Sequence, residues 1–86
     1  MSETRIGEVV HVFNKINVAV LSLRDSISVG DNVRFLGYST DFQQEVESLQ
    51  IEHQSVDDAF PGQDVAIKVA YRVRQHDKVF RLTDQD

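Results

Sequence analysis

The residues best suited to chemistry in this 86-residue chain are cations near its carboxyl end. Between residues 65 and 82 a single acid accompanies five of them: Lys68, Arg72, Arg74, Lys78 and Arg81. The first three are separated by even numbers of positions, so an extended strand would carry them on one outward face. Such a stripe can meet phosphates or a carboxylate surface. We expect these five residues to bind a partner, and the alternative is a solvated face that pairs with neighbouring acids.

An acidic stretch precedes these cations. Residues 41 to 64 contain no lysine or arginine and carry Asp41, Glu45, Glu47, Glu52, Asp57, Asp58 and Asp64. The stretch can attract a basic protein partner, or it can serve solubility and protect sheet edges. The whole chain has a formal net charge of -5, which disfavours non-specific binding to nucleic acid and to anionic membranes.

The sequence holds no recognisable catalytic or metal-binding pattern. His11, His53 and His76 lie far apart and lack the spacing of metal ligands. There is no cysteine, and no serine sits in a nucleophile elbow. Asp57 and Asp58 are adjacent, so a strand would point them to opposite faces. We therefore predict no catalytic, metal or cofactor-binding residue, and a protein that is not an enzyme.

The element that would position the cations is a strand over residues 65–74. Apolar and polar residues alternate there, with Val65, Ile67, Val69, Tyr71 and Val73 on the face predicted to be buried. Further strands are predicted over residues 5–13, 17–24, 32–38, 43–54 and 78–82, with a bulge near Ser48. Residues 55–60 are predicted to form a single helical turn.

Turn chemistry connects these strands. Residues 14–17 begin and end with asparagine and predict a short hairpin. Pro61 and Gly62 suit the centre of a type II turn, in which the glycine has a positive φ. Gly7 lies inside a strand, where its missing side chain lets a neighbouring strand approach. Four apolar residues are hard to place inside and are predicted to plug one end of the fold; exposed together, they would instead form a partner site. They are Leu36, Tyr38, Phe42 and Phe60.

Short strands separated by turns indicate an all-β domain. We predict a six-stranded, closed, Greek-key-like barrel, because closure removes the exposed edges that an open sheet would leave. The domain is expected over residues 5–82, with flexible tails at 1–4 and 83–86. The lack of cysteine, of a signal-peptide core and of a long apolar run favours a cytoplasmic protein without a membrane segment.

Four motifs in order carry a family resemblance. They are a G-x-V strand at residues 7–9, a Val-Gly-Asp turn at 29–31, a V-x-S-hydrophobic strand at 46–49 and an A-x-x-G-x-x-V turn at 59–65. The chain thereby resembles the second domain of elongation factor Tu and other translational GTPases, and above all small, free-standing elongation-factor-like proteins. Similar barrels also occur as appended domains of collagenase-like peptidases.

The resemblance implies a non-catalytic binding module that docks on tRNA, the ribosome or a translation-related protein. Neither a P-loop pattern nor an Asn-Lys-x-Asp motif occurs, so this chain is not expected to bind GTP. Two alternative functions involve no nucleic acid. The chain could be an acidic protein–protein interaction module, or the accessory barrel of an enzyme complex.

Overall fold

The computed structural model describes residues 2–83, and this span contains ten strands and no helix. The strands are β1 (Ser2–Phe13), β2 (Val18–Leu23), β3 (Ile27–Ser28), β4 (Asn32–Leu36), β5 (Asp41–Glu45), β6 (Leu49–Ile51), β7 (Gln54–Val56), β8 (Asp58–Ala59), β9 (Asp64–Lys68) and β10 (Lys78–Thr83). The prediction of an all-β fold is confirmed.

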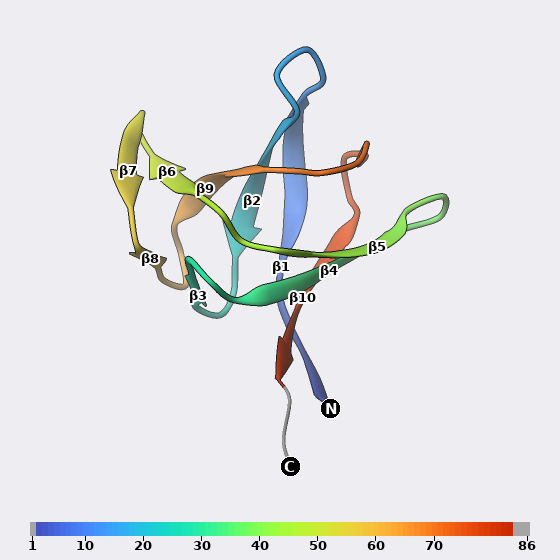
Figure 1. Cartoon of the computed structure of the whole chain (residues 1–86), viewed down its shortest axis with the longest axis horizontal. Helices are drawn as coiled ribbons and strands as arrows, with labels where there is room; N and C mark the ends of the chain where they lie inside the picture. The colour runs from blue at the N-terminus through green and yellow to red at the C-terminus, as the bar shows by residue number, and fades with distance from the viewer. Residues whose placement is uncertain (1, 84–86) are drawn as a thin grey trace.

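Eight of these strands form one antiparallel sheet, in the order β5-β4-β10-β1-β2-β9-β6-β7. Strands β3 and β8 pair separately. Figure 1 shows the large sheet curling so that β4 and β9, which are distant in its order, lie on two sides of one interior. The long strand β1 pairs with both β2 and β10 and forms the centre of the sheet.

The core fills that interior with aliphatic side chains and one aromatic ring. Phe35 is fully buried and stacks on the half-buried Phe42 with ring centroids 5.1 Å apart. The strand predicted over residues 65–74 is too long, because β9 ends at Lys68 and residues 69–74 belong to no strand. The alternation nevertheless predicted most of the buried face correctly, because Val65, Ile67, Val69 and Val73 are buried. Tyr71 is the exception, since the chain bends there and leaves the ring 65% exposed.

The sheet is not closed into a barrel, so the prediction of a closed six-stranded barrel is wrong. Strands β5 and β7 are its two edges. The physical reason lies after β5, where Val46 exchanges backbone hydrogen bonds of 2.9 and 2.8 Å with Gly30 and Asp31. Both backbone groups of Val46 thereby bond to the residues before β4, and no backbone hydrogen bond joins β5 to residues 69–73 in the described span. The side chain of Gln44 crosses the resulting opening instead.

Two predicted segments are divided differently in the structure. The strand expected over residues 43–54 is split into β5, β6 and β7, with residues 46–48 outside any strand. Residues 55–60 form parts of β7 and β8 rather than a helical turn. Phe60 is 56% exposed, so it does not plug the fold.

The ends of the described span are paired. Ser2 lies opposite Thr83 in the ladder between β1 and β10, so residues 2–4 and 83 belong to strands although they were expected in tails. Residues 1 and 84–86 of the expected tails lie outside the described span.

Two glycines behave as their positions predicted. A Cβ at Gly7 would collide with the backbone carbonyl of Ser22 on the neighbouring strand, so the close approach of β1 and β2 requires glycine. Gly62 has φ of 89°, and Gln63 N–H donates to the Phe60 carbonyl at 3.1 Å, as expected for the turn at Pro61 and Gly62.

Candidate functional site

The connection between β9 and β10, residues 69–77, forms an extended loop that we call the cationic loop. It crosses the upper half of Figure 1, whereas the start of β1 and the end of β10 lie at the bottom of that view. The loop is irregular because its two ends bond to different elements. At its start, Val69 N–H donates to the Asn17 carbonyl at 2.9 Å, in the β1–β2 hairpin turn. At its end, His76 N–H donates to the Val9 carbonyl at 2.8 Å.

A bulge in β1 receives the end of the loop. The pairing of β1 with β2 shifts between Val9 and His11, and the freed Val9 N–H donates to the Asp77 carbonyl at 2.8 Å. Asp77 is only 4% exposed. Its carboxylate accepts a 2.8 Å hydrogen bond from the backbone N–H of Arg74. The buried Asp77 carboxylate therefore fixes the backbone of the loop. It does not neutralise the exposed positive charges of the loop.

The structure brings together three of the five cations predicted to bind a partner. Arg72 and Arg74 lie on the cationic loop, and Lys78 begins β10. All three are exposed, and none forms an ion pair with another residue in the span 2–83. We call Arg72, Arg74 and Lys78 the cationic surface.

The other two predicted residues lie outside this surface. Lys68 ends β9, and its carbonyl accepts a hydrogen bond from Gln44. Arg81 is half-buried on β10, where its guanidinium donates to the Ser26 carbonyl at 2.6 Å and lies 3.7 Å from Asp25. Arg81 thus ties β10 to the turn before β3, and it is not free to meet a partner.

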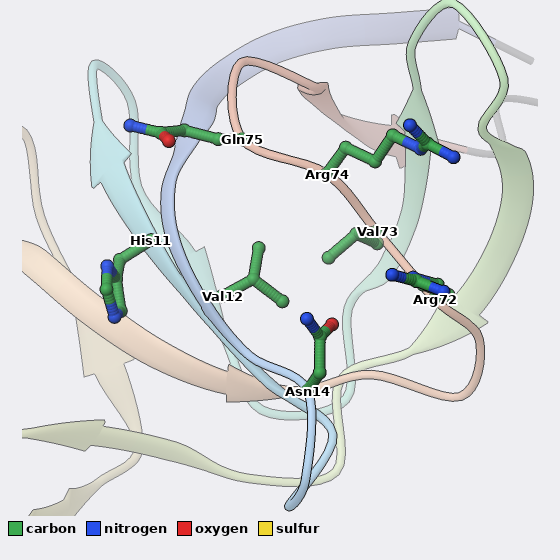
Figure 2. Close-up of a pocket in the computed structure, with 7 residues that line it drawn as sticks. All are labelled: His11, Val12, Asn14, Arg72, Val73, Arg74 and Gln75. Atoms are coloured by element: carbon green, nitrogen blue, oxygen red, sulfur yellow. The ribbon is translucent and has the colours of Figure 1, made fainter.

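Hollows flank the cationic surface, and Arg74 lines two of them. One has a volume of about 470 Å³ and is lined by Arg72, Arg74, Gln75 and Asn14 above Val12 and Val73. Figure 2 shows Val12 and Val73 between the polar side chains, with Asn14 directed toward them and Arg72 and Arg74 at the rim. A second hollow of about 430 Å³ lies between Arg74, Lys78 and Tyr38. Each is an open depression with a cationic wall, suited to an anionic surface group.

The electrostatics elsewhere on the molecule are dominated by one ion-pair group. Arg34 on β4 donates to both carboxylate oxygens of Asp41, at 2.8 and 2.9 Å, and to Glu3 at 2.9 Å. The hydrogen bonds to Asp41 and then to Glu3 raise the pKa of Arg34 above its usual value. The hydrogen bond from Arg34 lowers the pKa of Asp41. The pair joins β4 to β5 and is the largest cause of both pKa shifts.

The histidines do not converge. His11 packs edge-on against Phe13 with ring centroids 4.5 Å apart, and Nδ1 of His76 lies 3.2 Å from Glu8. His53 lies in the tight turn between β6 and β7 with φ of 66°. Within the described span, no three His, Cys, Asp or Glu side chains are grouped as metal ligands would be. Nor does a helix long and apolar enough to cross a membrane occur there.

Sequence reasoning missed Asn14, Tyr71 and Gln75 as site residues, whereas it offered Tyr38 and Phe42 as part of a partner site if they were exposed together. Tyr38 is fully exposed at the β4–β5 turn, and Tyr71 leans its ring edge-on toward Phe42 with centroids 5.1 Å apart. Asn14 and Gln75 line the first hollow. Tyr38 and Phe42 are hard to place in an alternating pattern, and this was the only signal in the sequence for the aromatic part of the site.

The chain is similar in sequence to proteins that are named as proteases. No model of a protein family matches the sequence. The chain is 35% identical over 80 residues to an uncharacterized protease of Methanocaldococcus jannaschii, a match that covers 92% of this chain and 20% of the relative. It is 29% identical over 86 residues to a collagenase of Porphyromonas gingivalis, covering 98% of this chain and 24% of that enzyme. The chain thus spans about a fifth to a quarter of these curated relatives.

Two of the solved structures that match are of a separately crystallised C-terminal domain. The C-terminal domain of a Geobacillus thermoleovorans protein described as a U32 peptidase superposes with a TM-score of 0.86 at 24% identity, covering 92% of both chains. Its selenomethionine variant gives a TM-score of 0.84 at 25% identity, covering 88% of this chain and 96% of the other. The fold is therefore that of the C-terminal domain of a collagenase-like U32 peptidase.

These findings correct the family resemblance inferred from the four motifs. The relatives and structural neighbours point to U32 peptidases, so the resemblance to elongation factor Tu and the expected function in translation are wrong. Those motifs describe turns and strands that many small β domains share, which is why they misled. The prediction that the chain is not an enzyme finds no support in relatives that are named as proteases.

Proposed function

We propose that this chain is a non-catalytic accessory domain for a collagenase-like peptidase. The observation that carries the proposal is the pattern of coverage. Nearly all of this chain matches only a fifth to a quarter of each protease, and it superposes along almost its full length on a separately solved C-terminal domain. A segment that folds by itself and forms a minor part of an enzyme is typical of an accessory domain.

The contacts of the reactive side chains also favour an accessory role. The Ser28 hydroxyl donates to Asp58 at 2.6 Å, on the surface between β3 and β8. His76 contacts Glu8, and His11 contacts Phe13. A nucleophilic serine would instead need to lie within hydrogen-bond reach of its histidine base. The ion pair of Arg34 and Asp41 shifts both pKa values for structural reasons.

In this proposal the cationic surface is where the domain holds its partner. Arg72, Arg74 and Lys78 are exposed beside two open hollows, and they offer donors suited to carboxylates. Arg81 contributes to the sheet rather than to this contact, because its guanidinium donates to the Ser26 carbonyl. Lys68 is exposed at the end of β9 but lines neither hollow. A protein partner is favoured over nucleic acid, since the chain as a whole is acidic.

A segment exchange tests the proposal. The Porphyromonas gingivalis collagenase is prepared in three forms: intact, without the segment that this chain matches, and with this chain in its place. We expect collagen cleavage to fall on removal and to recover in the chimera, while the 86-residue chain alone cleaves nothing. Cleavage by the isolated chain, or full activity of the shortened enzyme, would contradict the proposal.

A further inference from the structure

We infer that the cationic loop binds an acidic protein segment in an extended conformation, along the backbone of residues 71–74. This inference deepens the proposed function by naming the chemistry of the partner. It depends on the accessory role only for its biological meaning.

The backbone in the middle of the loop is unpaired. The loop is fixed at both ends, because Ala70 N–H donates to Gln44 at 2.7 Å and Arg74 N–H donates to Asp77 at 2.8 Å. Between them, the N–H groups of residues 71–73 donate to no protein group of the span 2–83. The chain bends at Ala70 and Tyr71, and Val73 is buried, so the free donors on exposed residues are those of Tyr71 and Arg72. Extended peptides bind unpaired backbone through main-chain hydrogen bonds.

Space is available on both sides of this segment. The hollow of about 470 Å³ described above lies on one side, with Val73 in its floor. On the other side, a hollow of about 540 Å³ is lined by Tyr71, Arg72 and Phe42 together with the β4–β5 turn. Arg72 borders both. Alternate side chains of an extended peptide point in opposite directions, so such a peptide would place successive side chains in the two hollows.

The charges select an acidic peptide. The nearby carboxylates are already engaged, Asp77 with the Arg74 backbone, Asp41 with Arg34, and Glu8 with Arg5 and His76. The guanidinium groups of Arg72 and Arg74 are without such a partner in the described residues. Guanidinium binds carboxylate through paired hydrogen bonds, which gives geometric selectivity as well as attraction.

Two exposed tyrosines support a peptide ligand. Tyr71 and Tyr38 flank the cations, and tyrosine is enriched where proteins bind proteins. Bases of a single-stranded nucleic acid could also stack on such rings. The acidic net charge of -5 opposes that ligand more strongly than it opposes a short peptide. The acidic peptide is therefore the occupant that we propose.

Fluorescence anisotropy at low salt tests the inference with three labelled probes. They are a ten-residue peptide of alternating glutamate and valine, the same peptide with lysine for glutamate, and a single-stranded oligonucleotide of the same length. We expect saturable binding of the glutamate peptide alone. The double variant Arg72→Ala, Arg74→Ala should weaken it about tenfold or more, because two charge-assisted contacts are lost. The matched control is Arg24→Ala, an exposed arginine on the turn after β2.

Amide exchange then locates the contact. The peptide should slow hydrogen exchange at the amides of Tyr71 and Arg72, whereas a purely electrostatic contact through side chains would leave those amides unchanged. Equal binding of the lysine peptide, preference for the oligonucleotide, or protection confined to other strands would each overturn the inference. None of these results depends on collagen cleavage, so a failure here can be told apart from a failure of the segment exchange.

Discussion

The side-chain carbonyl of Gln44 accepts a 2.7 Å hydrogen bond from the backbone N–H of Ala70, across the opening between β5 and the cationic loop. The same amide donates to the Lys68 carbonyl at 2.8 Å. One side chain thus makes the two bonds that a backbone ladder would otherwise make at this position. The Gln44 amide thus links β5 to the end of β9 and the start of the cationic loop, although no backbone ladder joins these segments.

Replacing Gln44 by alanine should lower the free energy of unfolding. The substitution removes both hydrogen bonds, and we expect a loss of about 1–2 kcal/mol. Urea denaturation of the two proteins measures the difference. Gln44→Glu should cost less, because a carboxylate still accepts from Ala70 but cannot donate to Lys68.

The neighbouring Gln43 provides the control for this change. It is exposed on the opposite face of β5 and makes no side-chain hydrogen bond within residues 2–83. Gln43→Ala should alter stability by no more than about 0.5 kcal/mol. Equal effects of the two alanine variants would show that Gln44 does not close the sheet.

Gly37→Ala should disturb the loop from the far side of Asp77. A Cβ at position 37 would collide with the Asp77 carboxylate, which would have to move and release the Arg74 N–H. We expect a destabilisation of about 1–3 kcal/mol, as found when a buried group loses its partner. Hydrogen exchange at the Arg74 amide should accelerate. An unchanged exchange rate at that amide would show that the carboxylate does not fix the loop.

The ion pair of Asp41 and Arg34 predicts a contribution to stability that depends on pH. The hydrogen bond from Arg34 lowers the pKa of Asp41 in the folded state below its ordinary value of 3.8. The contribution is therefore fully present above that value and is lost as the pH falls through the lowered pKa. Asp41→Asn should reduce the difference in stability between neutral and acidic solution.

Urea unfolding from pH 7 down to about pH 2 measures this effect, since that range brackets the titration of a carboxyl group. Glu47→Gln is the matched control, because Glu47 is exposed outside the strands and makes no ion pair in the described span. If the two variants lose stability in parallel as the pH falls, the pairing of Asp41 with Arg34 does not stabilise the fold.

A chain of three aromatic rings should couple the cationic loop to the core. Phe42 stacks on the buried Phe35 and meets the edge of Tyr71, with centroids 5.1 Å apart in both pairs. A double-mutant cycle with Phe42→Leu and Tyr71→Leu should give a coupling energy of about 0.5–1.5 kcal/mol. Additive effects of the two changes would mean that the Tyr71 ring lies free of Phe42 in solution.

The sequence predicted those features that depend on neighbours along the chain. The alternation from Val65 to Val69 and the conformation of Gly62 follow from local rules, and both hold in the structure. Arg81 was misplaced because its partner, the Ser26 carbonyl, is 55 residues away. Tyr71 continues the alternating pattern but points outward, because the chain bends there. Its ring contacts that of Phe42 edge-on.

The open sheet could not have been predicted for the same reason. It arises because Val46 bonds to Gly30 and Asp31, a contact between distant segments that no periodicity records. The candidate site, too, could be predicted from the sequence only in part. Sequence spacing identified Arg72 and Arg74 as neighbours, whereas the unpaired backbone between Ala70 and Arg74 became visible only with the loop in place.

The pairing of Ser2 with Thr83 also determines how the molecule responds to mechanical load. These residues face each other at one end of the antiparallel ladder between β1 and β10 (Figure 1). A force that separates them breaks the hydrogen bonds one pair after another, like a zipper, and never loads the whole ladder in shear. Stretching from these two positions should therefore detach β10 from β1 at low force, in small successive steps.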